Sequence, residues 1–289
     1  MRKAFIRLHL AVFLAGFTAV FGRLITLNEG LLVWYRLLIT AATMWLLFSI
    51  TKKLRRIAFI DVLKLSATGF LAALHWATFY GSIKYANISV GLVCFSAVGF
   101  FTAILEPIIQ RVRIKWIEVF LGLLVIAGIY IIFHFDPKYK TGIILGIISA
   151  LLIAVVMIYI RKFVQRINAE TLLTYQLTGG FIALSILMPF YLHHFPAKDL
   201  LPGLKDWMWL LILSWVCSVW AFQLSANALK KLSAFTVNLS YNLEPVYGIL
   251  LAFLIYRENE NFGPSFYAGL ALIILAVALQ SYRLVKKKT

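Results

Sequence analysis

Long apolar runs, separated by short polar or charged breaks, follow one another along the whole chain. A helix needs about 20 mostly apolar residues to cross a bilayer. Because lipid offers no partners for backbone polar groups, such runs are predicted to be helices and not open strands. Ten runs meet this description: 6–27, 31–50, 64–84, 88–110, 117–135, 142–161, 171–192, 207–228, 235–256 and 265–284.

Composition agrees with a chain whose solvent is largely lipid. Of the 289 residues, 62% are hydrophobic and only 13% are charged, whereas soluble proteins carry about 25% charged residues. The formal net charge of +17 would suggest nucleic acid in a soluble protein. Here the basic residues cluster in the breaks between apolar runs, so membrane lipid is the expected partner and nucleic acid is not.

The distribution of Lys and Arg predicts the orientation. With the N-terminus placed inside, the inner segments hold 20 of the 28 basic residues and the outer segments hold seven, while Arg36 lies within a span. Cytoplasmic segments are enriched in Lys and Arg. We therefore expect a multi-pass protein with both termini in the cytoplasm.

A repeat relates the two halves of the chain, 1–137 and 138–289. Five spans per half is an odd number, so the second half should be inverted relative to the first. The predicted fold is an all-α integral membrane protein of ten transmembrane helices, arranged as two inverted five-helix repeats. The matched positions are Asn28 with Asn168 and Tyr35 with Tyr175 at a separation of 140, Trp76 with Trp220 at 144, Arg111 with Arg257 at 146, and Gly122 with Gly269 at 147.

Several short motifs resemble one transporter family. They are Ser233-Ala234-Phe235-Thr236 through Asn242-Leu243-Glu244-Pro245, Phe100-Phe101-Thr102-Ala103 into Leu105-Glu106-Pro107, Tyr35-Arg36-Leu37-Leu38, Gly122-Leu123 and Gly269-Leu270. With these motifs the chain is similar to the ten-helix EamA branch of the drug/metabolite transporter superfamily. Two positions depart from the branch, which often has Gly before Glu258 and Pro at the position of Gly99.

The resemblance implies a transporter of a small metabolite, with amino-acid-like solutes and export most expected, in the bacterial inner membrane. Inverted repeats that meet near the midplane suit alternating access around a central cavity. A lipid-linked carrier or flippase is the first alternative. An intramembrane enzyme is the second, and it would need convergent ionisable groups such as Glu244 with Arg36 or His75.

Glu244 is the strongest candidate for coupling or gating. It lies nine residues into the ninth predicted span, which places it about 13 Å deep, near the middle of a hydrocarbon core about 30 Å thick. Pro245 follows and removes a helix hydrogen bond, so the helix can bend there. An ionisable group at that depth is a functional hypothesis by default. The alternative is a protonated Glu244 that bonds a neighbouring helix as a structural contact.

Further polar and aromatic residues within the spans are candidates for binding the solute. Arg36 could hold a carboxylate, or it could extend to the interface or pair with Glu29. The Trp residues could stack on the solute or anchor the helices at the interface. The substrate-binding candidates are Arg36, Trp76, Tyr80, Trp220, Gln223, Asn227, Asn238, Tyr241 and Asn242.

No motif predicts catalysis, a cofactor or a metal. His193-His194 has no third ligand at a convincing spacing, and the chain lacks phosphate-loop and hydrolase motifs. We therefore expect a protein that is not an enzyme, with no catalytic residues, no cofactor and no metal. The expected partners are membrane lipid and a small solute, with protons as a candidate coupling ion and a homodimer as a candidate assembly.

Overall fold

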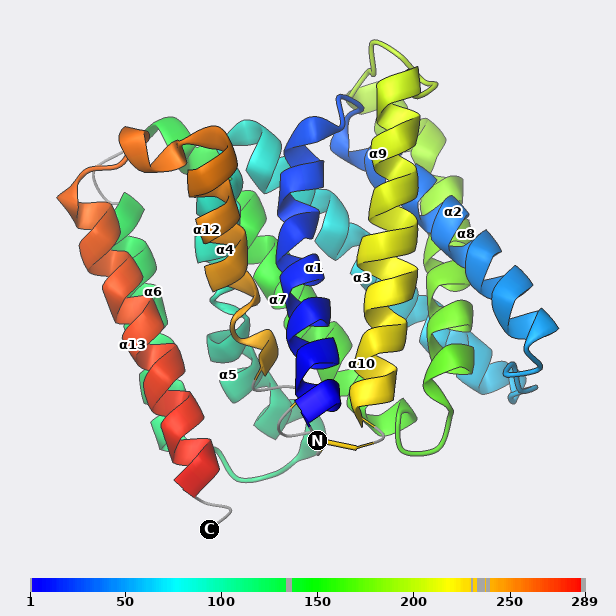
Figure 1. Ribbon diagram of the computed structural model, residues 1–289, viewed down its shortest axis with the longest axis horizontal. Helices are drawn as coiled ribbons and strands as arrows, with labels where there is room; N and C mark the ends of the chain where they lie inside the picture. Colours follow the sequence, from blue (N-terminus) through cyan, green and yellow to red (C-terminus); the bar gives the residue numbers. More distant parts are fainter. Residues whose placement is uncertain (1, 134–136, 230, 233–236, 238–239, 287–289) are drawn as a thin grey trace.

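The computed structural model describes residues 2–133, 137–229, 231–232, 237 and 240–286 (Figure 1). These residues form helices joined by short turns, with no strand among them. The first repeat contains α1 (Arg2–Leu24), α2 (Glu29–Ile50), α3 (Phe59–Tyr85), α4 (Ile88–Phe95), α5 (Val98–Gln110) and α6 (Trp116–Phe133). The second contains α7 (Lys140–Phe163), α8 (Ala169–His194), α9 (Leu204–Ser214), the π-helical turn η2 (Trp215–Trp220), α10 (Ala221–Leu229), α12 (Glu244–Tyr256) and α13 (Pro264–Lys286), with short 3-10 turns η1 (Pro137–Tyr139) and η3 (Glu258–Asn261).

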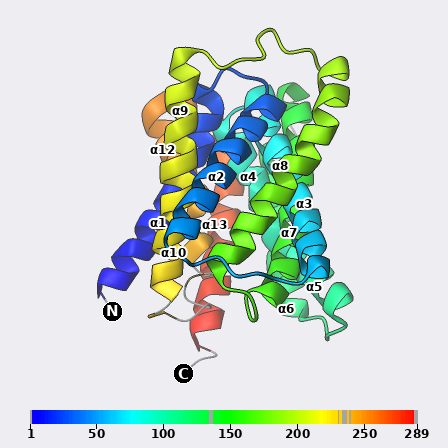
Figure 2. The ribbon, with the colours of Figure 1, turned by 90° about the vertical axis from the view of Figure 1, so that its right-hand side faces the viewer.

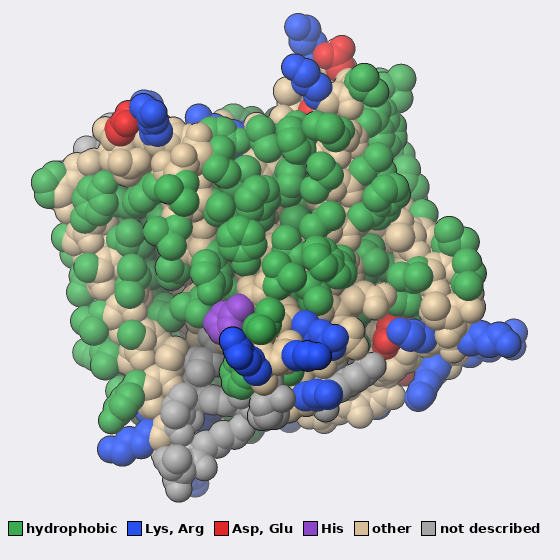
Figure 3. Space-filling view, in the orientation of Figure 1, with side chains coloured by type: hydrophobic (Ala, Val, Ile, Leu, Met, Phe, Trp, Pro, Cys, Tyr) green, Lys and Arg blue, Asp and Glu red, His purple; other side chains and the backbone are tan. Residues whose placement is uncertain are grey.

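The helices form one bundle whose long elements run in the same general direction (Figure 1). In the described residues, eight spans are long and apolar enough to cross a membrane, α4 with α5 counting as one, and α6 and α12 are shorter apolar helices. On the face that Figure 3 shows, apolar side chains form a broad band, with Lys and Arg along its two rims. These features confirm the predicted all-α membrane fold of ten spans.

Both chain ends lie at the same end of the bundle, which we call the termini end; the opposite end is the far end (Figure 1). In the view turned by 90°, α1, α9 and α12 lie on one side, and α3, α7 and α8 lie on the other, with α2 crossing between them (Figure 2). The core is made of apolar side chains from most helices, and Tyr80, Phe48 and Phe266 are among its largest fully buried members.

Two predicted spans are broken in mid-course. Ser96 and Ala97 separate α4 from α5, and Asn242 and Leu243 form a turn before α12. Pro245 contributes to the second break, because it has no N–H to donate to a carbonyl of the preceding turn. At the first break, the Ser96 hydroxyl bonds the carbonyl of Leu92 within its own helix, a contact that competes with regular helix.

The broken helices α5 and α12 are equivalent in the two repeats. Each has 13 residues, and each ends at an arginine with left-handed backbone, Arg111 at φ 54° and Arg257 at φ 51°. These arginines were matched at a separation of 146 by sequence. Asn28 and Asn168, matched at 140, stand at the N-caps of α2 and α8 with nearly the same backbone angles. The repeat therefore extends to details of backbone geometry.

Glycines bring some helices into close contact. Gly69 of α3 and Gly180 of α8 face each other, and a Cβ atom at either would collide with the backbone of the other helix. Gly128 of α6 and Gly269 of α13 form a second such crossing. Small residues let membrane helices approach closely, so these crossings gain van der Waals contact that bulkier residues would prevent.

Candidate functional site

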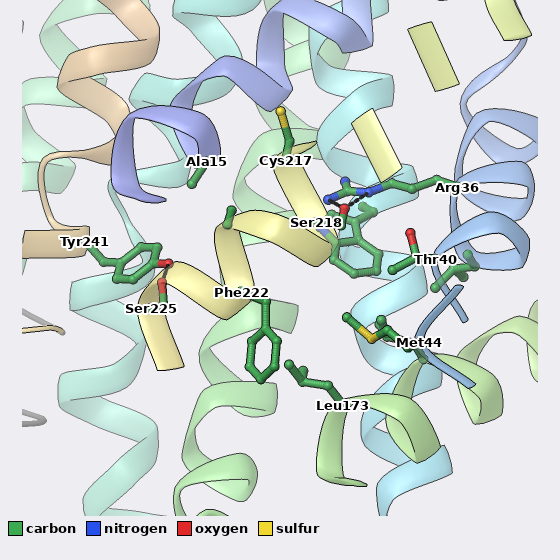
Figure 4. Close-up of a pocket in the computed structure, with 14 residues that line it drawn as sticks. Ala15, Arg36, Thr40, Met44, Leu173, Cys217, Ser218, Phe222, Ser225 and Tyr241 are labelled. Atoms are coloured by element: carbon green, nitrogen blue, oxygen red, sulfur yellow. Dashed lines mark hydrogen bonds between the residues drawn. The ribbon is translucent and has the colours of Figure 1, made fainter. Parts of the chain in front are cut away.

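A cavity of about 220 Å³ lies between the two repeats (Figure 4). The first repeat contributes lining residues from α1, α2 and α3, and the second from α8, η2, α10 and the segment before α12. Its lining residues are Ala15, Arg36, Leu37, Thr40, Met44, Trp76, Leu173, Leu177, Cys217, Ser218, Ala221, Phe222, Ser225 and Tyr241.

Arg36 is the charged group of this cavity. It begins the third turn of α2, and its side chain is 5% exposed. Nη1 donates to the Tyr80 hydroxyl at 2.6 Å, while Nε and Nη2 both donate to the Ser218 hydroxyl at 3.2 and 3.0 Å. The guanidinium also lies 4.3 Å from the centre of the Trp76 ring. Three side chains, two from α3 and one from η2, therefore hold the cation in place.

Ser218 reaches Arg36 because of the π-helical turn η2. Its hydroxyl donates to the carbonyl of Leu213, five residues earlier, at 3.1 Å. A π-helical turn contains one residue more than an α-helical turn, and such turns often occur at functional sites. The binding candidates Trp220, Gln223 and Asn227 would share one face of a regular α-helix, but Trp220 is the last residue of the π-helical turn. Trp220 is 48% exposed at the surface, and none of the three lines the cavity.

The structure places the remaining binding candidates at different distances from the cavity. Arg36, Trp76 and Tyr241 line the cavity, and Tyr80 is a fully buried partner of Arg36. The Tyr241 hydroxyl forms a hydrogen bond with the Ser225 hydroxyl at 2.6 Å. Asn242 lies in the turn before α12 and off the cavity lining, while Asn238 lies outside the described residues.

Glu244 is the first residue of α12, not a residue in the middle of a continuous helix as predicted. Pro245 follows in the first turn, where the missing N–H costs nothing. The backbone of Glu244 packs on α1, because a Cβ atom at Gly16 would lie 2.9 Å from the Glu244 carbonyl oxygen. No described residue donates a hydrogen bond to its carboxylate. It is half-buried and does not line the cavity itself.

At the far end, polar contacts join the two repeats. Glu258 of η3 is 2% exposed and accepts hydrogen bonds from Arg23 and from the backbone of Ile88 and Ser89, with the Ser89 hydroxyl as a further donor. Asp206 of α9 accepts from the backbone and the hydroxyl of Thr26. These contacts connect the far ends of α1 and α4 with α9 and η3.

Several lining residues were not predicted from the sequence. Thr40 and Met44 follow Arg36 at helical spacing on α2, and this periodicity could have revealed them. Ser218, Phe222 and Ser225 also follow one another at helical spacing, so the same periodicity could have grouped them. Within the described residues, no group of three His, Cys, Asp or Glu could hold a metal ion.

These features define a helical membrane protein of two inverted repeats, which together line a small cavity with the buried Arg36 in its wall. The model of the EamA-like transporter family matches residues 2–134 and 140–282, once for each repeat, and the chain belongs to this family. It is therefore a transporter of the drug/metabolite transporter type and a multi-pass membrane protein. No curated protein matches the chain.

Solved structures also resemble this fold. One crystal structure of a protein is 16% identical, and the match covers 100% of both chains with a TM-score of 0.65. At this identity the match shows the fold alone.

Proposed function

We propose that the chain is a secondary transporter that moves a small organic metabolite by alternating access around the central cavity. The observation that carries this proposal is a cavity lined by both repeats with a buried arginine in its wall. Its 220 Å³ equals the liquid volume of roughly seven waters, which suits a small solute. We further propose export of amino-acid-like solutes from a bacterium, across the inner membrane, with both termini in the cytoplasm.

The two repeats differ in a way that supports alternating access. Gly180 packs tightly against Gly69 at the crossing of α8 and α3. Thr40 is the counterpart of Gly180 at the separation of 140 residues, and it faces the cavity instead. An exchange of these two packings between the repeats would close the cavity on one side and open it on the other. The contacts of Glu258 and Asp206 would then hold the far end closed in the present state.

We also propose that Glu244 couples transport to protons. Its carboxylate starts a broken helix within the membrane and has no described hydrogen-bond donor. Burial favours the neutral form of a carboxylic acid, and hydration favours the charged form. A transporter that hydrates Glu244 in one state only would therefore link proton binding to the change of state.

The transport proposal is tested by narrowing the cavity. Purified protein is screened for thermal stabilisation by amino acids, nucleosides and lipid precursors, and each stabilising solute is then tested by counterflow in proteoliposomes. Met44→Trp inserts a large ring into the cavity lining, whereas Met157→Trp places the same ring at a position 56% exposed on α7. We expect counterflow to be lost in the first variant and kept in the second.

Equal counterflow in both variants would contradict transport through this cavity. Stabilisation and movement of lipid precursors alone would favour the flippase alternative instead.

A further inference from the structure

Arg36 is a buried cation whose hydrogen-bond partners are neutral. Tyr80 and Ser218 offer it hydroxyl oxygens, and no described carboxylate lies within ion-pair distance of its guanidinium. Glu29, a partner that the sequence allowed, accepts a hydrogen bond from Tyr191 instead. A buried charge is costly unless an opposite charge or a set of hydrogen bonds compensates it. Glu244 interacts electrostatically with Arg36 from beyond ion-pair distance. When Glu244 is neutral, the positive charge of Arg36 is therefore available to a ligand.

The guanidinium also has N–H groups left to donate. It carries five N–H donors, and its hydrogen bonds to Tyr80 and Ser218 use one on each of its three nitrogens. One N–H remains on each terminal nitrogen. Two N–H groups are what a carboxylate accepts when it binds an arginine through both oxygens.

Thr40 gives a second, independent indication of a ligand. It lies one turn after Arg36 on α2, lines the cavity and is 2% exposed. Its hydroxyl has no hydrogen-bond partner among the described residues, although buried hydroxyls are normally paired. Figure 4 shows Thr40 beside Arg36 in the cavity wall. A ligand oxygen held by Arg36 could also pair with this hydroxyl.

The rest of the cavity near Arg36 is apolar. Leu37, Met44, Leu177 and Phe222 form much of its wall, and no described lining residue is acidic. An ammonium group would meet the positive charge of Arg36 without gaining an ion pair with a lining residue. A multiply charged anion would carry more negative charge than the single positive charge of the lining could neutralise. The lining thus favours one negative charge on an apolar body.

We propose that the cavity binds organic monocarboxylates with an apolar body, and that Arg36 and Thr40 together hold the carboxylate. This inference rests on the transport function proposed above and replaces its expected solute, a zwitterionic amino acid, with an organic acid that lacks the amino group.

Calorimetric titration of purified wild-type protein tests the substrate class. One series has a branched aliphatic body: 4-methylpentanoate, 4-methylpentanamide, 4-methylpentylamine and leucine. The second has a phenyl body: phenylacetate, phenylacetamide and phenethylamine. In at least one series the carboxylate should bind roughly tenfold or more tightly than its amide, as expected for a charge-assisted hydrogen bond. 4-Methylpentanoate should also bind more tightly than leucine, and inorganic phosphate should not compete.

Variants locate the subsite. Arg36→Gln should abolish the preference for carboxylate over amide, and Arg36→Lys should restore part of it. Thr40→Val removes the hydroxyl at nearly constant shape and should weaken carboxylate binding several-fold. The controls are Arg113→Gln, in an exposed segment, and Thr102→Val, whose hydroxyl bonds its own helix at Val98. Both controls should leave the preference unchanged.

The wild-type titrations decide the matter even if an Arg36 variant fails to fold. Equal binding of acid and amide in both series, or tighter binding of leucine or an amine, would overturn the substrate class. A preference that survives Arg36→Gln in folded protein would overturn the assignment of the subsite. Counterflow of a neutral or cationic solute, lost in Met44→Trp, would leave the transport function intact while this inference fails.

Discussion

The helices α5 and α12 occupy equivalent places in the two repeats and differ in chemistry at one end. Both follow a break, both contain 13 residues, and both end at a left-handed arginine. Yet α5 starts with Val98 and α12 starts with Glu244. Because Val98 begins the same kind of helix without a carboxylate, the fold does not require Glu244 to make the break. The carboxylate is an addition to one repeat, which favours a functional role for it.

The Glu-Pro pairs of the two helices strengthen this contrast. Glu106 and Pro107 lie near the end of α5, and Glu106 forms an ion pair with Arg161 of α7. Glu244 and Pro245 open α12, and no described residue forms an ion pair with Glu244. The same dipeptide therefore occurs once near a helix end, with its carboxylate in an ion pair, and once at a helix start, with no described partner for its carboxylate.

The largest expected effect separates these two glutamates. Glu244→Gln imitates the protonated acid, so the pH dependence of transport should become flat, while folding and solute binding persist. A step that needs one proton changes up to about tenfold per pH unit. Glu106→Gln should keep the wild-type pH profile. The measurement is the initial rate in proteoliposomes across a pH series. A wild-type profile in Glu244→Gln would mean that Glu244 is a structural contact.

A smaller effect separates two tryptophans that the repeat also relates. Trp76 lies beneath the Arg36 guanidinium, whereas Trp220 is 48% exposed at the surface. Trp76→Phe weakens a cation–π contact of about 1 kcal/mol and alters the cavity wall, so solute affinity should fall about fivefold. Trp220→Phe should leave affinity unchanged. Titration of both variants with the same solute checks this, and equal losses would show that the two rings share one environment.

The sequence predicted the spans and the repeat well, because both depend on long apolar runs and on matched residues far apart. Most spans begin and end within a few residues of their predicted runs, but α12 begins at Glu244, well inside the run 235–256, and α4 and α5 divide the run 88–110. The breaks were missed because a single polar residue, such as Ser96 or Asn242, does not end a long apolar run. The cavity lining was predicted only in part. Arg36, Trp76 and Tyr241 were found as polar or aromatic residues at depth, whereas Ser218 is a small hydroxyl residue that is neither charged nor aromatic and was not singled out.

The smallest expected effect concerns the residues at which α5 and α12 agree. Arg111 and Arg257 hold left-handed backbone, a conformation that costs most residues about 1–2 kcal/mol and glycine nearly nothing. Glycine also gains entropy in the unfolded chain, which offsets part of this relief. Arg111→Gly and Arg257→Gly should therefore each stabilise the protein by about 0.5 kcal/mol. The Arg257 contact with Glu260, at 3.9 Å and exposed, should contribute little.

Unfolding measured in detergent should give the same small gain for both variants, because the two helix ends share one geometry. A gain in one and a loss in the other would show that the repeats differ at this end too.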